Sequence, residues 1–401
     1  MSSLIICQSG GPTSAINSTL VGVIKEARKH PEITKILGSR FGINGVINNN
    51  FYEITNDNPL TNWNITPGAI LGSARIKLKN YQDDSTTYNK ILKTLQDNDV
   101  HYFIFIGGND SMDTCFKIDN YLKSINYKCN VIGLPKTIDN DLSYNYFDPG
   151  YPSCAKYIAG TINELICDLR VYEKGRATVI EIMGRDAGWL AASSVLSRIN
   201  SEGVDLIYLP ELPFNQDKML EDVKKIYDKK GRVVIAVSEG IRTKNGNYLI
   251  EEKTKEIDTY GHLQLGGVAA ILADTINKKL NISTRAIELS LPQRCGIHFA
   301  SKKDLDISEE NGRWGIKYLL NGVSGKMINI DFINNKFTYN PIELNKVANV
   351  VRKFPLEWIK DDNDISDEFI NYIKPLIEGE IQIPFKNGLP YFVDIDRKIL
   401  N

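Results

Sequence analysis

The sequence lacks the features that mark membrane, secreted and nucleic-acid-binding proteins. No apolar run approaches the roughly 20 residues that a membrane-spanning helix needs. The first apolar run, residues 4–7, has no charged segment or cleavage site before it, which disfavours a secretion signal. The 48 basic residues nearly balance the 49 acidic ones, so there is no positive excess for nucleic acid or an anionic membrane. We therefore expect a cytoplasmic protein that binds neither, although small anionic substrates would need only local arginines and lysines.

Cysteine and histidine chemistry is also missing. The six cysteines form no CxxC pair, and no set of Cys and His has the spacing of a zinc site. The cysteines mostly stand in apolar or helical surroundings, which is typical of reduced thiols in a core. No GxSxG motif is present, which argues against a serine nucleophile of the α/β-hydrolase kind. We interpret His262 and His298 as packing or substrate-contact residues.

What the sequence does have is a repeated alternation of short apolar runs, polar loops and helical segments. A chain of 401 residues with 42% hydrophobic content can bury a sizeable core. The alternation predicts two doubly wound, Rossmann-like α/β/α lobes with the active site in the cleft between them. We expect residues 1–145 to form one lobe, completed by a returning segment near 296–325, and residues 146–295 to form the other. Residues 326–401 are expected to be a mostly helical C-terminal extension with a short hairpin near 328–339.

The strongest local signal is the stretch 131–141, which reads VIGLPKTIDND. It begins like a buried strand and ends in a polar loop that contains Lys136, Asp139 and Asp141. Ligands of open α/β sheets bind beyond the carboxyl ends of the strands. The same residues could form a simple Asx turn that caps a helix, but we favour a loop that holds the general base of a phosphoryl transfer.

Two glycine-rich turns follow other predicted strands. The first, at Gly10 and Gly11, stands between a predicted strand and a helix, as in α/β sheets that bind nucleotides or phosphates. It lacks the Lys-Ser/Thr of a P-loop and the GxGxxG spacing, so a tight turn that needs glycine for its backbone angles is an equally good interpretation. After the strand 101–106, two glycines would let a ligand approach the backbone, and the amides of the next helix could hold an anion. Asn109 and Asp110 offer oxygens suited to Mg²⁺, although an Asp here could also be a helix N-cap.

Cations and carboxylates gather at the predicted strand ends. The cations are Arg75, Lys136, Arg176, Arg185, Arg294 and Lys303, and the carboxylates are Asp110, Asp139, Asp141 and Glu239. Each one alone could be a helix cap or a solvated surface charge. Their shared placement suits a reaction that moves phosphate between two anionic partners, because cations and Mg²⁺ stabilise the transferred group while a carboxylate takes the proton of the attacking hydroxyl.

An ordered set of motifs in this chain resembles the 6-phosphofructokinase family, and most closely its diphosphate-dependent members. The motifs are Gly107-Gly-Asn-Asp-Ser111, Pro135-Lys-Thr-Ile-Asp-Asn-Asp141, Met183-Gly-Arg185, Pro210-Glu211 followed by Phe214, and Ser238-Glu-Gly240, in the family's order. The resemblance implies reversible, Mg²⁺-assisted transfer of a phosphoryl group from diphosphate to the 1-hydroxyl of fructose 6-phosphate, a step of glycolysis. It also implies that residues 1–145 bind the phosphate donor and residues 146–295 the sugar phosphate, in a homodimer or homotetramer whose active sites are shared across an interface.

The resemblance assigns roles to individual residues. Asp139 would be the general base, and Asp141, Thr137 and Arg185 would act beside it. The donor would be bound by Gly11, Arg75, Asp110 and Lys136, and Mg²⁺ by Asn109 and Asp110. The sugar phosphate would be bound by Thr137, Arg176, Met183, Gly184, Arg185, Glu239 and Arg294, with Arg176 and Arg294 holding the 6-phosphate across a subunit interface.

The choice of donor depends on Asp110 and Lys136. ATP-using relatives tend to have glycine at both positions. A carboxylate at position 110 would crowd and repel the α-phosphate of a nucleotide, whereas the Lys136 ammonium could occupy that space and neutralise diphosphate. We therefore predict diphosphate as the donor. The alternatives are an ATP-dependent 6-phosphofructokinase and a non-catalytic regulatory subunit of the same fold.

Overall fold

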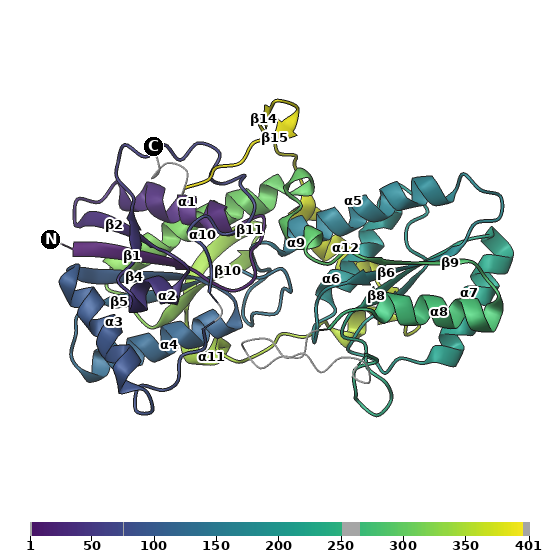
Figure 1. Ribbon diagram of the computed structural model, residues 1–401, viewed down its shortest axis with the longest axis horizontal. Coiled ribbons are helices and arrows are strands. Elements are labelled where there is room, and N and C mark those ends of the chain that lie inside the picture. Colours follow the sequence, from purple (N-terminus) through teal and green to yellow (C-terminus); the bar gives the residue numbers. More distant parts are fainter. Residues whose placement is uncertain (1, 75, 251–264, 396–401) are drawn as a thin grey trace.

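The computed structural model describes residues 2–74, 76–250 and 265–395, and it shows two α/β lobes lying side by side along the long axis (Figure 1). The first lobe is built on a seven-stranded sheet with the order β11-β10-β5-β4-β1-β2-β3. Its parallel strands are β1 (Ser2–Gln8), β2 (Ile33–Ser39), β4 (Val100–Gly107), β5 (Asn130–Pro135) and β10 (Lys326–Ile333). The edge strands β3 (Phe51–Glu53) and β11 (Lys336–Glu343) run antiparallel to their neighbours.

Helices cover both faces of this sheet, because its central strands are apolar on both sides. In β1, Leu4 and Ile6 face one core while Ile5 and Cys7 face the other. One face packs against α1 (Ile16–Ala27) and α10 (Lys302–Leu320), and the other against α2 (Ile43–Ile47), α3 (Ser85–Asp97), α4 (Asn109–Ser124) and α11 (Leu344–Val347). Burial on both faces is what a parallel sheet requires.

The second lobe repeats this arrangement around a four-stranded parallel sheet with the order β7-β8-β6-β9. Its strands are β6 (Ala177–Ile182), β7 (Leu206–Tyr208), β8 (Val233–Ser238) and β9 (Thr284–Glu288). One face carries α5 (Tyr151–Leu169) and α6 (Trp189–Ser193), and the other α7 (Gln216–Lys230) and α8 (Val268–Leu280). The short helix α9 (Pro292–Cys295) and the 3-10 turns Ser194–Ile199 and Ile297–Phe299 complete the lobe. Two doubly wound lobes, as the sequence predicts, are thus confirmed.

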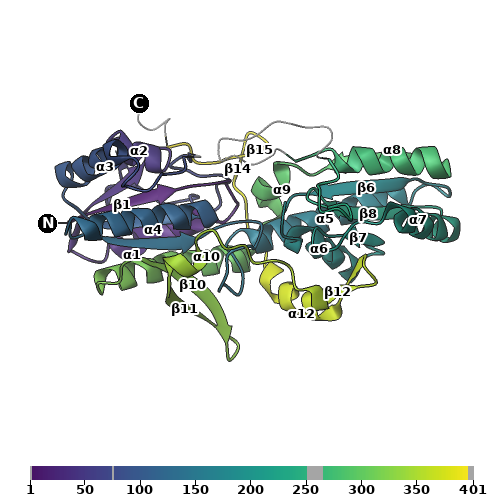
Figure 2. The same cartoon turned by 90° about the horizontal axis from the view of Figure 1, so that it is seen from below.

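The C-terminal region differs from the prediction of a mostly helical extension, which is wrong. The predicted hairpin is confirmed, but its strands β10 and β11 are eight residues each and complete the first sheet, since Met327 pairs with Gly133 of β5. The chain then crosses to the second lobe, where α12 (Asp367–Ile373) lies beneath α6 (Figure 2). The remaining elements are short: β12 (Ile359–Lys360), β13 (Asp364–Ile365), β14 (Phe385–Lys386), β15 (Leu389–Pro390), and the 3-10 turns Leu356–Trp358 and Lys374–Ile377. Alternating apolar residues in β10 fit a strand, and that pattern outweighs the helical composition around it.

Within the described ranges, no helix is both long enough and apolar enough to cross a membrane.

Candidate active site

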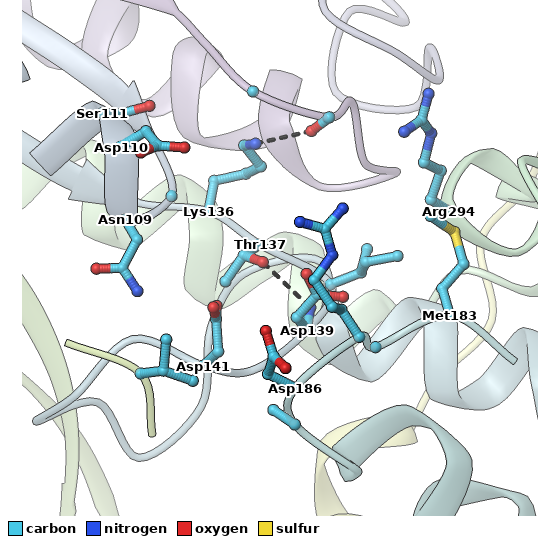
Figure 3. A pocket seen from close by; sticks show the side chains of 18 of the residues that line it. Asn109, Asp110, Ser111, Lys136, Thr137, Asp139, Asp141, Met183, Asp186 and Arg294 are labelled. Atoms are coloured by element: carbon cyan, nitrogen blue, oxygen red, sulfur yellow. Dashed lines mark hydrogen bonds between the residues drawn. The ribbon is translucent and has the colours of Figure 1, made fainter. Parts of the chain in front are cut away.

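A cleft of about 450 Å³ lies where the carboxyl ends of β1, β4 and β5 in the first lobe face those of β6 and β8 in the second (Figure 3). Most of the residues that the sequence predicts for the site line this cleft. They are Gly11, Asn109, Asp110, Lys136, Thr137, Asp139, Asp141, Met183, Gly184, Arg185, Glu239 and Arg294. The cleft therefore gathers side chains from loops that are far apart in the sequence.

Two predicted residues are not among them. Arg75 lies outside the described residues. Arg176 precedes β6, so it lies at the opposite end of this strand from Met183, with its guanidinium carbon 5.9 Å from the centre of the Tyr172 ring. Its predicted role across a subunit interface stays a prediction.

The loop that follows β5 is fixed by backbone hydrogen bonds at both ends. Lys136 N donates to Gly107 O (3.0 Å), and Thr137 N donates to Pro149 O (3.2 Å). Within the loop, Asp139 N donates to Thr137 Oγ1 (3.1 Å), as Figure 3 shows. The alternative of an Asx turn that caps a helix is wrong, because the next helix, α5, begins only after Gly150. The Asp139 and Asp141 residues line the cleft instead of capping a helix.

The surroundings of Asp139 raise its pKa from the ordinary value for an aspartate to about 7. Burial is the main cause, and the neighbouring Asp141 and Glu239 carboxylates add to it, while Arg185 and Lys136 act in the opposite direction. Burial likewise raises the pKa of Asp141. A carboxylate whose pKa lies near neutrality is well suited to take a proton from a hydroxyl.

The Lys136 ammonium lies on the side of the cleft that the first lobe forms, which is the predicted donor side. Its Nζ donates to Gly11 O (2.7 Å), and the residue is only 2% exposed. Gly10 has a positive φ of 76°, which explains why a glycine is needed there, whereas Gly11 has an ordinary φ and lines the cleft. Gly10 lines the cleft as well, so the tight-turn interpretation is confirmed by the backbone angle of Gly10, and ligand binding by Gly11 stays a prediction.

Asp110 is not the N-cap of α4, so the alternative of a simple capping aspartate is wrong. Gly108 is the N-cap, and no described side chain caps it. The Asp110 carboxylate instead lines the cleft, with one oxygen 3.9 Å from Lys77 Nζ. Lys77 was not among the predicted residues, and the available signal was its position in a loop two residues after Arg75.

The donor side fits a magnesium ion through Asp110. Mg²⁺ in phosphoryl-transfer enzymes is held by one or two carboxylates together with substrate phosphates and water, and the open Asp110 carboxylate suits this role. Among the described residues, no cluster of three His, Cys, Asp or Glu forms a ready-made metal cage. The Asn109 amide donates from Nδ2 to Val350 O (2.9 Å), and its buried Oδ1 accepts no hydrogen bond from any described residue. Ligation by Asn109 thus stays a prediction.

On the opposite side of the cleft, the Met183-Gly-Arg185 motif packs closely against the Ser238-Glu-Gly240 motif. Glu239 Oε1 accepts hydrogen bonds from the backbone N–H groups of Gly184 and Arg185, both at 3.3 Å. A side chain at Gly240 would place its Cβ 1.5 Å from Arg185 O, so only glycine fits. Arg185 has a φ of 23°, a strained value for a residue with a side chain. Close packing of the two motifs therefore dictates the backbone from which Arg185 and Glu239 project.

Arg294 of the second lobe reaches the Gly10–Gly11 turn of the first lobe. Gly11 leaves room for it, because a Cβ at that position would lie 3.1 Å from Arg294 Nη1. The neighbouring Gln293 accepts a hydrogen bond from Met183 N (3.2 Å). Arg294 therefore lines the cleft of its own chain, and the role across a subunit interface that the resemblance implies for it stays a prediction.

The C-terminal region also contributes residues to the cleft that were not predicted. Asn349 and Val351 line the cleft, although they are more than 100 residues from every predicted site residue except Arg294. Asp186 lines it as well, directly after the Met-Gly-Arg motif. Asn349 and Val351 belong to no motif, and only the crossing of the chain between the lobes brings them here.

Comparison with known proteins agrees with this geometry. A family model described as phosphofructokinase matches residues 3–301. The pyrophosphate–fructose 6-phosphate 1-phosphotransferase of Xanthomonas campestris pv. campestris is 34% identical over 405 residues, covering 98% of this chain and 96% of that protein. The crystal structures of pyrophosphate-dependent phosphofructokinases from Nitrosospira multiformis and Marinobacter aquaeolei are 30% identical, with TM-scores of 0.88 and 0.87. They cover 98% of this chain, which in turn covers 96% and 95% of theirs.

Proposed function

The chain belongs to the phosphofructokinase family, and we propose that it is a diphosphate-dependent 6-phosphofructokinase. It transfers a phosphoryl group from diphosphate to the 1-hydroxyl of fructose 6-phosphate, giving fructose 1,6-bisphosphate and phosphate. The observation that carries the proposal is the placement of Asp110 and Lys136 together on the donor side of a cleft whose other side holds Glu239 and Arg185.

Asp139 acts as the general base. It takes the proton of the 1-hydroxyl while that oxygen forms a bond to the terminal phosphorus of diphosphate, and the bond from this phosphorus to the bridging oxygen breaks. The leaving group is phosphate. The raised pKa of Asp139 supports this role, because about half of the carboxylate is ionised near pH 7 and the group is basic enough to take the proton. In the reverse direction, the protonated Asp139 returns the proton to the sugar oxygen. Since the phosphoryl groups of diphosphate and fructose 1,6-bisphosphate have similar transfer free energies, we expect a readily reversible reaction.

Lys136 and Asp110 select the donor. The Lys136 ammonium sits against the Gly11 carbonyl, where it can neutralise diphosphate. Asp110 narrows the space in which the rest of a nucleotide would extend, and its charge repels an α-phosphate. Lys77, beside Asp110, adds a second cation on this side. Bound magnesium would supply charge neutralisation on the diphosphate oxygens, held by Asp110 and by the phosphates themselves.

The sugar phosphate binds on the side of the second lobe. Glu239 and the backbone around Met183 and Gly184 face the sugar, and Thr137 and Arg185 lie between the sugar and the transferred group. Arg294 serves the 6-phosphate, and Arg176 joins it from another subunit. We place the enzyme in the cytoplasm, in glycolysis, as a homodimer or homotetramer.

The initial rate with fructose 6-phosphate and Mg²⁺ tests the proposal, comparing diphosphate with ATP in the wild type and in Asp110→Gly/Lys136→Gly. We expect turnover with diphosphate alone in the wild type and a gain of ATP use in the double variant. A wild-type preference for ATP would favour the ATP-dependent alternative. Turnover with neither donor would favour the regulatory subunit.

A further inference from the structure

A short segment of the C-terminal region, residues 349–354, runs along the cleft from one lobe to the other; we call it the strap. At its start, Asn349 Nδ2 donates to Asp113 Oδ1 of α4 (3.1 Å). At its end, Phe354 N donates to Glu211 Oε1 of the second lobe (2.9 Å), and the same oxygen accepts from Gly188 N (2.8 Å). The strap is therefore anchored in both lobes, and Glu211 of the Pro-Glu motif is its anchor in the second.

In the middle of the strap, Arg352 holds the loop that carries Asp139 and Asp141. Its backbone N–H donates to Asp141 O (2.7 Å). Its guanidinium donates to Asn140 O from Nε (3.0 Å) and Nη2 (2.8 Å), and from Nη1 to the carbonyls of Asn145 and Tyr146. One side chain thus joins the outgoing and the returning halves of this loop.

The same arginine fixes the loop to the second lobe through Trp189, the first residue of α6. Trp189 Nε1 donates to Arg352 O (3.0 Å), and the guanidinium carbon lies 4.6 Å from the centre of an indole ring. An arginine suits this place because its planar fork can donate to several carbonyls while its face rests on an aromatic ring. A lysine would keep the charge and lose the fork.

The loop also has internal bonds, but these set its shape rather than its place in the cleft. Asp148 accepts from Leu142 N (2.9 Å) and from Asn145 Nδ2 (2.6 Å), and its own N–H donates to Asn140 Oδ1 (2.8 Å). The bonds of Arg352 reach both the loop and the other lobe, and the Tyr372 hydroxyl of α12 supports them by donating to Tyr146 O (2.7 Å) and accepting from Asn140 Nδ2 (3.1 Å). Arg352 itself is not among the described residues that line the cleft, so it acts through the loop and not on the substrate.

We propose that Arg352 is a positioning residue, which holds the Asp139 loop against both lobes so that the general base meets the sugar hydroxyl. The inference rests on the proposed function, because it concerns the base of that reaction. Small displacements of a catalytic group lower the rate of the chemical step much more than they lower binding. Loss of the fork should therefore act on kcat and leave the affinity for both substrates nearly intact.

The test compares Arg352→Met and Arg352→Lys with Arg198→Met. Arg198 is a matched control, because its guanidinium also donates to backbone carbonyls, those of Val204 and Asp205, at a site away from the cleft. We expect kcat with diphosphate to fall by about 10²-fold in both Arg352 variants, with KM for either substrate changed less than about threefold. Arg198→Met should lose a similar amount of thermal stability with kcat nearly unchanged. A kcat loss no larger than in Arg198→Met, or an effect on KM alone, would overturn the inference.

Hydrogen exchange gives a second readout that needs no turnover. The backbone amides of residues 137–148 should exchange faster in Arg352→Lys than in the wild type, while those of β4 stay unchanged. Unchanged exchange in the loop would refute the role of Arg352 even if the enzyme proved to use another donor. Conversely, a wild type without diphosphate-dependent turnover but with faster loop exchange in the variant would refute only the proposed function.

Discussion

The ammonium of Lys136 donates a 2.7 Å hydrogen bond to the carbonyl oxygen of Gly11, which joins the loop after β5 to the turn after β1. Two strands that are neighbours of β4 thus present one nearly buried cation at their shared carboxyl edge. A cation held in this way keeps its position without any substrate, so little reorganisation is needed when diphosphate arrives.

Replacement of Lys136 by methionine removes this cation and preserves most of the side-chain volume. Hydrogen bonds to charged groups contribute roughly 1.5–3 kcal/mol, which corresponds to about 10- to 150-fold. We therefore expect kcat/KM for diphosphate to fall within that range, with binding of fructose 6-phosphate in the absence of donor unchanged by calorimetry. Lys128→Met, at an exposed lysine on the same lobe, is the control. An equal loss of fructose 6-phosphate binding would contradict the assignment of Lys136 to the donor.

The raised pKa of Asp139 predicts the pH dependence of the forward reaction. A general base works only when ionised, so kcat/KM for fructose 6-phosphate should fall about tenfold per pH unit below a pKa near 7 and level off above it. An aspartate with an ordinary pKa would give a flat profile between pH 5.5 and about 8. The profile should be compared at saturating diphosphate in buffers of constant ionic strength, and a flat result would refute the predicted environment of Asp139.

The same shift predicts that Asp139 costs the folded protein stability at neutral and alkaline pH. Between the ordinary pKa and about 7, the folded state binds more protons at this site than the unfolded state, so the site's contribution to the free energy of unfolding falls as pH rises. Asp139→Asn carries no titrating group and escapes this cost. We expect its Tm to exceed that of the wild type at pH 8 and the difference to shrink towards pH 4. Thermal unfolding of both proteins at pH 8 and pH 4 measures this trend, and a Tm difference that does not change with pH would contradict it.

Much of the fold and half of the site follow from local sequence signals. Buried strands such as 101–106 and 177–182 are continuous apolar runs, and each ends in a polar loop, so the residues at the cleft could be named before the fold was known. Asp139, Lys136 and Asp110 were found in this way. These residues lie at strand ends because strands, polar loops and helices alternate along the chain.

The C-terminal contribution could not be predicted, because its meaning depends on long-range placement. Arg352 follows no strand and belongs to no motif, and its four hydrogen-bond partners on the loop, Asn140, Asp141, Asn145 and Tyr146, are more than 200 residues away. The hairpin of β10 and β11 was predicted, but its place in the first sheet was not, because the sequence of a hairpin does not reveal that β5 lacks a partner on that side. Lys77 was not predicted because it belongs to no motif, although Arg75, two residues before it, was named.

Interlocking of the two sugar-side motifs predicts that Gly240 tolerates no side chain. In Gly240→Ala, the new methyl group would meet Arg185 O at 1.5 Å, so either the strained backbone at Arg185 or the Glu239 loop must move. We expect KM for fructose 6-phosphate to rise at least tenfold and Tm to fall, with KM for diphosphate affected much less. Gly175→Ala is the matched control, since the nearest atom to its Cβ would be 3.4 Å away. A sugar KM equal to that of the wild type would show that the motifs do not depend on one another.

The position of Arg176 at the far end of β6 leads to a test with mixed subunits. If Arg176 serves the cleft of a partner subunit, a hybrid of Asp139→Asn and Arg176→Met chains contains one site that keeps both residues, in the chain with an intact Asp139. Refolding an equal mixture of the two inactive variants as dimers should then restore about a quarter of the wild-type rate, because half of the dimers are hybrids with one good site of two. If Arg176 acts within its own chain or serves only the fold, no site in the hybrid gains a residue it lacked, and the mixture stays as inactive as the separate variants. A chain that carries both substitutions, mixed with Asp139→Asn, is the control and should restore nothing in either case. The rate of the mixture alone therefore decides whether the active site is shared.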